Sequence, residues 1–339
     1  MDALNVALVG IGGRGRAHAN AMAAAPNINF VAICDIDEEV GTAAAEEFET
    51  EYVPSTDELY ARDDIEAVGI CVQTPLHHKL AMEAIEAGRH LLTEKPMAAS
   101  HAEAREMKEA VAEADLVAAL SYQLRFGPVY RKMKELAGQI NPLQVMFARQ
   151  RGMLKEQYLT PKPFDGIMDF ISHDIDMVPF LAGLPPRAVC TTLRRNTWQD
   201  RDAIDVIGAQ VEFGDEDDPV IGYISSSMGG GGMPQRLDIV GESGFAYLSG
   251  NTITFTTSEN PPGPQDRRDM WDLESKAEGR DYTADLYEHW ASCVLDRSRD
   301  LAPAASYEDG YNALLLTLAM VESGRIGEKV VLEEYAKTL

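Results

Sequence analysis

The segment that most constrains the fold is residues 5–18, NVALVGIGGRGRAH, in which an apolar run leads into a glycine-rich turn. Gly10, Gly12 and Gly15 spell G-x-G-x-x-G between a predicted strand and a predicted helix. Such a turn is tight, and it lets the backbone approach a pyrophosphate at the N-terminus of the helix. The pattern therefore predicts a nucleotide-binding loop, although glycine turns after strands also arise simply to reverse the chain.

An acidic residue stands at the distance that such a loop requires. Asp35 closes the second apolar run, FVAICD, twenty positions after Gly15. A carboxylate there accepts hydrogen bonds from both hydroxyls of the adenosine ribose and repels a 2′-phosphate. We therefore predict NAD as the cofactor. Arg14 leaves NADP open, because a guanidinium in the glycine loop could pair with a 2′-phosphate.

Strands and helices alternate through the first third of the chain, which predicts a doubly wound parallel sheet of the Rossmann type over residues 1–121. Ligands of such sheets gather at the carboxyl ends of the strands. Gly10, Asp35, Thr74 and Lys95 all fall at predicted strand ends. The residues assigned to the cofactor site are Gly10, Gly12, Gly13, Arg14, Gly15, Asp35, Thr74, Pro75, His77, Glu94 and Lys95.

Beyond residue 121 the pattern changes to successive strands with short connections, which predicts an antiparallel sheet in an α+β domain over residues 122–339. A helix is expected near 129–137, and two helices near 285–294 and 307–323 close the chain before a short strand at 329–332. The expected strands are 143–151, 188–195, 203–213, 220–227, 236–248 and 252–257.

The chain of 339 residues is strongly acidic, with 55 Asp plus Glu against 30 Lys plus Arg and a formal charge of −25. Such a surface repels nucleic acid and anionic membranes, so we expect neither of them as a partner. One interpretation is an ordinary acidic cytosolic enzyme. We favour a halophilic one, in which carboxylates keep the surface hydrated and salt screens their repulsion.

No apolar run reaches the length of a membrane span, and the N-terminus enters a strand almost at once, so we expect a cytoplasmic protein without a signal peptide. The four cysteines lie far apart, without a C-x-x-C motif or a nearby histidine pair. We therefore expect neither disulfides nor a metal site. The cysteines are Cys34, Cys71, Cys190 and Cys293.

Two groups of residues could carry chemistry. Asp169 and His173 are four positions apart, which on a helix places them one turn apart on the same face. A carboxylate beside an imidazole raises its basicity, as a general base needs, although an ordinary surface pair has the same spacing. Lys95, between Glu94 and Pro96 at a strand end, could hydrogen-bond a substrate hydroxyl or oppose charge on a developing alkoxide; a solvated lysine is the alternative.

Several motifs together resemble the glucose-fructose oxidoreductase, inositol dehydrogenase and MocA family. They are GIGGRGRAH (10–18), TPLHH (74–78), AGRHLLTEKP (87–96), SYQLRFGP (121–128) and GIMDFISHDID (166–176). The resemblance implies a Rossmann domain followed by a domain whose open, mostly antiparallel sheet mediates homodimers or homotetramers. It also implies that Lys95 touches the nicotinamide ribose and the substrate, that His173 is the acid/base residue, and that Asp169 lies beside it.

The same resemblance implies a function, the NAD-dependent oxidation of a secondary alcohol in a neutral sugar, polyol or inositol. Arg125 would line the nicotinamide side of the substrate pocket, although a helix-capping salt bridge explains it nearly as well. Three alternatives remain: a glycosidase that retains NAD and oxidises its substrate transiently, a nucleotide-sugar dehydrogenase, and a non-catalytic NAD-binding regulator. The last is expected to lose the lysine or the histidine, and this chain keeps both Lys95 and His173.

Overall fold

The structure is a computed structural model that describes residues 3–151, 171–195, 204–228, 235–249, 252–259, 269–272 and 282–339. It divides into two compact units, of which the first comprises residues 1–126 and 279–314 and the second 127–278 and 315–339. The domain boundary expected at residue 121 thus lies near the first crossing between the units, and the chain afterwards returns to the first unit. Each unit has a sheet of its own.

The first unit contains a seven-stranded sheet in the order β15-β6-β5-β4-β1-β2-β3. Strands β1 to β6 pair in parallel, and β15 is antiparallel to β6. This confirms the predicted Rossmann sheet, in which β1 leads into the glycine turn. The strands are β1 (Leu4–Val9), β2 (Ile28–Cys34), β3 (Glu51–Val53), β4 (Ala67–Ile70), β5 (His90–Thr93), β6 (Ala118–Leu120) and β15 (Ala305–Ser306).

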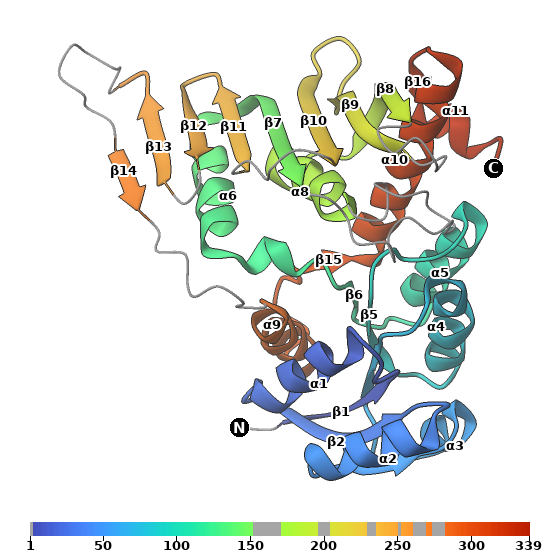
Figure 1. Ribbon diagram of the computed structural model, residues 1–339. Coiled ribbons are helices and arrows are strands. Elements are labelled where there is room, and N and C mark those ends of the chain that lie inside the picture. Colours follow the sequence, from blue (N-terminus) through green and yellow to red (C-terminus); the bar gives the residue numbers. More distant parts are fainter. Residues whose placement is uncertain are drawn as a thin grey trace. The chain divides into compact units, whose positions relative to one another are not determined.

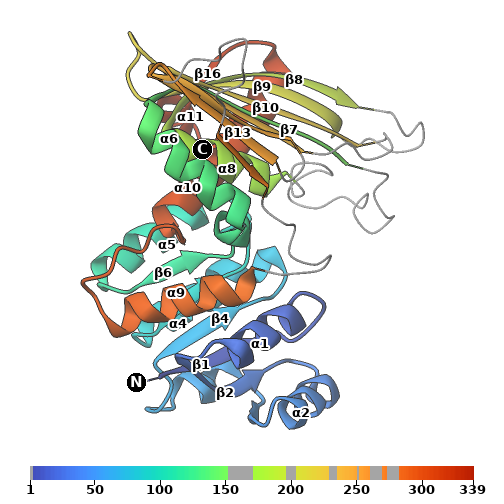
Figure 2. The same ribbon diagram turned by 90° about the vertical axis from the view of Figure 1, so that its left-hand side faces the viewer.

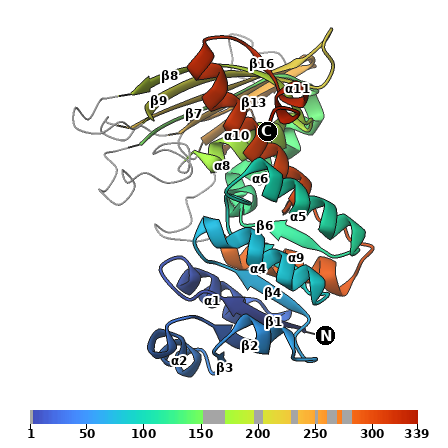
Figure 3. The same ribbon diagram turned by 90° about the vertical axis from the view of Figure 1, so that its right-hand side faces the viewer.

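Helices cover both faces of this sheet. On one face α1 packs against α9, and both contact β1 and β2; on the other α4 packs against α5 and contacts β4 and β5 (Figures 1 and 3). The helices are α1 (Gly15–Ala24), α2 (Glu38–Glu47), α3 (Thr56–Tyr60), α4 (His77–Glu86), α5 (His101–Glu113), α9 (Thr283–Leu295) and the first part of α10 (Tyr307–Ile326). Two short 3₁₀ turns, η1 (Thr74–Leu76) and η2 (Gln123–Phe126), follow β4 and β6.

The core of the first unit depends on a late segment of the chain. Tyr287 and Trp290 of α9 are fully buried, together with Leu8 of β1 and Met22 of α1. Aromatic side chains of this size bury more apolar surface than any other residue type. The helix itself was predicted, but the sequence pattern assigned it to the second domain, because its core partners lie more than 260 positions earlier.

The sequence analysis missed β3 and α3, although a local signal for α3 exists. The hydroxyl of Ser55 accepts the backbone N–H of Glu58 at 3.2 Å and caps the helix. Serine followed three positions later by glutamate is a known start signal for helices. The same pattern at Ser100 and Glu103 forms a complete capping box at the start of α5.

The second unit contains a nine-stranded sheet in the order β14-β13-β12-β11-β7-β10-β9-β8-β16. All neighbours are antiparallel except β7 and β10, which confirms the mostly antiparallel sheet. The strands are β7 (Pro142–Arg151), β8 (Pro186–Arg195), β9 (Ile204–Phe213), β10 (Val220–Met228), β11 (Arg236–Gly241), β12 (Gly244–Ser249), β13 (Thr252–Thr257), β14 (Asp269–Asp272) and β16 (Val330–Val331).

One predicted strand, 236–248, was wrong, because the chain reverses within it. The segment forms the hairpin of β11 and β12, whose turn residues are Glu242 and Ser243. Gly241 and Gly244 flank the turn, and a Cβ on either would clash with a backbone carbonyl of a neighbouring segment. The apolar alternation continues through both strands, so only the G-E-S-G sequence marks the reversal.

Helices cover one face of the second sheet (Figure 2). Contacts join α6 (Pro128–Ile140) to β11, β12 and β13, and α8 (Ser172–Ala182) to β7 and β10; α11 (Leu332–Ala336) contacts β8. Buried residues alternate along β9, as expected for a sheet with one covered face. On the other face Tyr223 and Val240 are exposed. None of the helices in the described part of the chain combines the length and the apolar character needed to cross a bilayer.

Candidate cofactor and catalytic site

The glycine loop of the first unit is shaped to leave space above its backbone. Gly10 has a positive φ of 91°, and a Cβ there would clash with the carbonyl of Cys71. A Cβ on Gly15 would clash with the carbonyl of Gly10, whereas a Cβ on Gly12 or Gly13 would meet nothing within 4 Å. Since α1 begins at Gly15, the open backbone leads into a helix N-terminus, whose dipole favours a bound anion. These residues fit a dinucleotide pyrophosphate.

Asp35 follows β2 at the neighbouring strand end, where its carboxylate is oriented by the backbone. Its Oδ2 accepts the N–H of Ile11 at 2.8 Å, and its Oδ1 accepts the N–H of Asp37 at 2.9 Å. Each carboxylate oxygen has a further lone pair, so the half-buried side chain can still accept from two hydroxyls. The arrangement fits the ribose contact predicted for Asp35.

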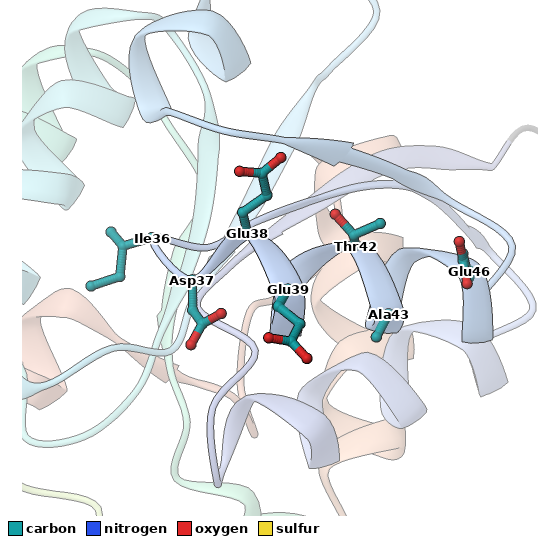
Figure 4. Close-up of a pocket in the computed structure, with 7 residues that line it drawn as sticks. All are labelled: Ile36, Asp37, Glu38, Glu39, Thr42, Ala43 and Glu46. Carbon is teal, nitrogen blue, oxygen red and sulfur yellow. The ribbon is translucent and has the colours of Figure 1, made fainter.

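Next to Asp35 the surface is acidic. Ile36 is fully exposed, and a shallow hollow extends from it along α2 as far as Glu46 (Figure 4). The carboxylates that line this hollow would repel a phosphate bound there. The lining residues are Ile36, Asp37, Glu38, Glu39, Thr42, Ala43 and Glu46.

The side chain of Arg14 is directed to the end of β5, three strands from Asp35. Its Nε donates to Glu94 Oε1 at 3.1 Å, and its Nη2 donates to the hydroxyl of Thr283 at 2.9 Å. When the amide nitrogen of Gln123 donates to the carbonyl oxygen of Ser121, the amide oxygen of Gln123 accepts from Arg14 Nη2 at 3.0 Å. The guanidinium of Arg14, which could pair with the 2′-phosphate of NADP, is therefore engaged by partners away from Asp35.

Glu94, directly after β5, is the centre of a buried polar network. His18 Nε2 lies 2.8 Å from Glu94 Oε1, and His18 Nδ1 lies 2.9 Å from the hydroxyl of Tyr287. Burial alone would raise the pKa of Glu94, but the hydrogen bond from His18 and the charges of His18, Lys95 and Arg14 outweigh it. The pKa of Glu94 is therefore held well below its usual range, and the group is a carboxylate.

Lys95 is anchored by its backbone on both sides. Its N–H donates to Glu94 Oε2 at 2.9 Å, and the following peptide bond to Pro96 is cis. His77 Nδ1 lies 2.8 Å from the carbonyl oxygen of Pro96, and His77 Nε2 lies 3.1 Å from that of Val72. Burial lowers the pKa of His77, which favours the neutral ring.

His77 therefore lies beneath the Lys95 turn, with 1% of its surface exposed, and offers no ring edge to a cofactor. Of the other predicted cofactor residues beyond β4, Thr74 begins η1 half-buried and Pro75 is exposed. The structure thus brings the glycine loop, Asp35, Thr74 and Lys95 to the carboxyl-end edge of one parallel sheet.

Within the described residues one group could in principle hold a metal ion, since ligand atoms of His18, Cys71 and Glu94 lie within 4.8 Å of one another. Hydrogen bonds to Glu94 and Tyr287 already engage both nitrogens of His18. Burial and the charge of Glu94 raise the pKa of Cys71, so the thiol stays protonated. Hydrogen bonding accounts for this cluster, and we assign no metal to it.

In the second unit His173 occupies the first turn of α8 and is half-buried. The neighbouring Asp174 is buried and lies 3.5 Å from Arg149 Nη1 of β7, which ties this end of the helix to the sheet. Asp169 lies outside the described residues. The predicted pairing of Asp169 with His173 therefore stays a prediction.

Arg125 of η2 is buried and pairs with a helix cap. Its Nη1 lies 3.4 Å from Asp309 Oδ2 in the first turn of α10. The same Asp309 oxygen accepts the N–H of Ser306, whose hydroxyl accepts the N–H of Asp309 in return. These contacts match the helix-capping interpretation of Arg125, while a substrate contact stays a prediction.

Sequence reasoning missed His18, Thr283, Tyr287 and Gln123 as parts of the site. His18 stands in the glycine motif, and its spacing from Gly15 was the available local signal. Tyr287 and Thr283 gave none, because they meet the loop only through the return of α9 to the first unit.

A parallel sheet with an open glycine loop, a carboxylate after β2 and a lysine after β5 defines a nucleotide-binding protein of the Rossmann class. The chain belongs to the Gfo/Idh/MocA family: residues 4–122 match the model of an oxidoreductase family with an NAD-binding Rossmann fold, and residues 134–247 match the GFO/IDH/MocA C-terminal domain. It is thus an NAD-binding oxidoreductase of that family.

Named relatives extend over nearly the whole chain. It is 28% identical to the inositol 2-dehydrogenase of Acidothermus cellulolyticus, over 95% of this chain and 93% of that protein. It is 24% identical to the myo-inositol 2-dehydrogenase of Thermotoga maritima, over 98% of this chain and 99% of that protein. A levoglucosan dehydrogenase solved with NADH and L-sorbose shares the fold with a TM-score of 0.83 at 22% identity, covering 98% of this chain and 99% of that one. Other matches, such as the oxidoreductase YrbE of Bacillus subtilis, span about half of the relative, 53% in that case.

Proposed function

We propose that the protein is an NAD-dependent dehydrogenase that oxidises a secondary alcohol of a neutral sugar, polyol or inositol. The observation that carries the proposal is the single sheet edge that presents the open glycine loop, Asp35 and the anchored Lys95. The names of two relatives that match over 93% and 99% of their own length, both inositol dehydrogenases, support the substrate class.

The preference for NAD over NADP follows from charge. Asp35 keeps lone pairs for two ribose hydroxyls, and Asp37, Glu38 and Glu39 add negative charge beside it. A 2′-phosphate would meet repulsion there, and Arg14 does not offset it, because Arg14 is engaged by Glu94 and Thr283.

We assign roles in the chemistry to three residues, Lys95, Asp169 and His173. NAD, when bound, supplies the hydride acceptor. The imidazole of His173 takes the proton of the reacting hydroxyl, with Asp169 holding the ring in the basic tautomer. The ammonium of Lys95 hydrogen-bonds the same oxygen and stabilises negative charge as it develops there.

Two variants test these roles. Lys95→Ala and His173→Ala should each lower kcat by roughly 10²- to 10⁴-fold, while the Kd for NADH, followed by its fluorescence, should change by less than about threefold. The matched control is Lys79→Ala, which removes an exposed lysine of α4 that pairs only with the next helical turn. Turnover close to wild type in either variant would refute the assignment.

Substrate class is tested by a panel of myo-inositol, scyllo-inositol, D-glucose, levoglucosan and UDP-N-acetylglucosamine, each with NAD and NADP. A nucleotide sugar is included because one relative, 29% identical over 54% of this chain, is a UDP-N-acetylglucosamine 3-dehydrogenase. Steady NADH formation with a free sugar or inositol supports the proposal. Glycoside cleavage without net NADH would instead indicate the NAD-retaining glycosidase.

We further propose salt adaptation and self-association for this chain. The charge of −25 predicts that moving from about 0.1 M to 2 M KCl raises the Tm and preserves activity, because screening removes the self-repulsion. Loss of activity in high salt would contradict this. The sheet face on which Tyr223 and Val240 are exposed favours a homodimer or homotetramer, which sedimentation in the same buffers would measure.

A further inference from the structure

We propose that Glu94 is the positioning residue for Lys95: its carboxylate fixes the backbone from which the reactive ammonium extends. The inference rests on the proposed function, since it assigns a purpose to the anchoring of Lys95 in a dehydrogenase. Glu94 itself exposes only 7% of its surface, so it acts through its neighbour.

The first step is that both oxygens of Glu94 are engaged. Oε2 accepts the N–H of Lys95 at 2.9 Å. Oε1 accepts from Arg14 at 3.1 Å and lies 2.8 Å from His18 Nε2. Bonds from charged or oriented donors on a buried carboxylate are shorter and stronger than neutral ones, so the carboxylate plane is fixed.

The second step is that two of the donors to Glu94, Arg14 and His18, come from a distant part of the chain. His18 lies on α1, three residues beyond the glycine loop, and its far nitrogen meets the hydroxyl of Tyr287 on α9. A carboxylate accepts only, so His18 Nε2 carries the proton toward Glu94. His18 Nδ1 lies 2.9 Å from the Tyr287 hydroxyl, so both ring nitrogens of His18 have a partner in the chain Tyr287–His18–Glu94.

The third step concerns Lys95 itself. Its side chain has four rotatable bonds, and an ammonium at the end of such a stem is precise only if its base is held. The Glu94 carboxylate holds the N–H before the side chain, and His77 holds the Pro96 carbonyl after it. Because errors of about 1 Å at a reacting group can cost 10²-fold in rate, this anchoring predicts a kinetic role.

A double-mutant cycle tests the role. Glu94→Gln keeps the size of the side chain, but an amide cannot accept from His18, Arg14 and Lys95 at once. We expect it to lower kcat by roughly 10- to 100-fold, measured as NADH formation with the fastest compound of the panel above. In a Lys95→Ala background the same change should lower kcat by less than about threefold, because the residue it positions is gone.

A second measurement does not need turnover. In the cofactor-free protein, hydrogen exchange of the segment 93–97 should become faster in Glu94→Gln, because the Lys95 N–H loses its acceptor. Pro96 has no N–H, so few amides contribute to the signal. If Glu94→Gln fails to fold, Tyr287→Phe replaces it, since it removes only the hydroxyl at the far end of the network. The control is Tyr60→Phe, which removes a hydroxyl bonded to the Leu80 carbonyl in the same unit.

The outcomes separate the two proposals. Equal losses of kcat from Glu94→Gln with and without Lys95, or unchanged exchange at 93–97, would overturn the positioning role and leave the dehydrogenase intact. A Lys95→Ala variant with normal turnover would instead overturn the proposed function. A loss in Glu94→Gln that disappears in the Lys95→Ala background, together with faster exchange, supports both.

Discussion

Two carboxylates at the same edge of the Rossmann sheet have opposite surroundings. Asp35, after β2, is half-buried, accepts the backbone N–H groups of Ile11 and Asp37, and directly precedes the residues that line an exposed, acidic hollow. Glu94, after β5, is buried and accepts from His18, Arg14 and the N–H of Lys95. Strand ends of one sheet thus carry the same functional group for two purposes. Spare lone pairs favour binding a ligand at Asp35, and saturated ones favour holding the protein in place at Glu94.

The largest effect should come from removing the carboxylate of Asp35, which keeps lone pairs for a ligand. Asp35→Ser would take away both proposed ribose contacts and part of the repulsion of a 2′-phosphate, so the ratio of kcat/KM with NAD to that with NADP should fall by about 100-fold. Initial rates with both cofactors measure the ratio, and Asp57→Ser on α3 serves as an exposed acidic control. An unchanged ratio would show that Asp35 does not select the cofactor.

A smaller effect, on the free energy of unfolding, is expected when acid protonates Glu94. The pKa of Glu94 is lowered from its ordinary 4.5, so its contribution to the free energy of unfolding is complete above that value. The contribution is lost as the pH falls below 4.5 toward the depressed folded value. Urea unfolding of wild type and Glu94→Gln should therefore differ by on the order of 2 kcal/mol at pH 7 and by less at pH 3. A gap that widens in acid would contradict the depressed pKa.

The smallest effect is expected when the side chain of Arg14, a donor to Glu94 but not to Asp35, is removed. Arg14→Ala should lower kcat by about 10-fold, because Glu94 loses one donor, and should leave the NAD to NADP ratio within about twofold. A selective loss of NADP use would show instead that the guanidinium reaches a 2′-phosphate. Arg16→Ala, whose side chain pairs with Glu47 at the surface, is the matched control.

How much could be predicted from the sequence depended on separation along the chain. The glycine loop, Asp35 and the strand before Lys95 are encoded within short windows, and the parallel and antiparallel sheets followed from local periodicity. The partners of Glu94 could not be predicted, since His18 lies 76 positions away, and Tyr287 lies 269 from His18. No local pattern relates such residues, because tertiary packing alone brings them together.

The position of α9 has a consequence for how this protein is made. Tyr287 and Trp290 complete the interior of the first unit, yet they leave the ribosome long after Leu8 and Met22. The nascent N-terminal segment therefore has an unfilled apolar groove while the intervening 150 or so residues are synthesised. We therefore expect the core of the nucleotide-binding unit to be complete only after α9 has been synthesised, and a chain terminated before residue 279 to be less stable than the full chain.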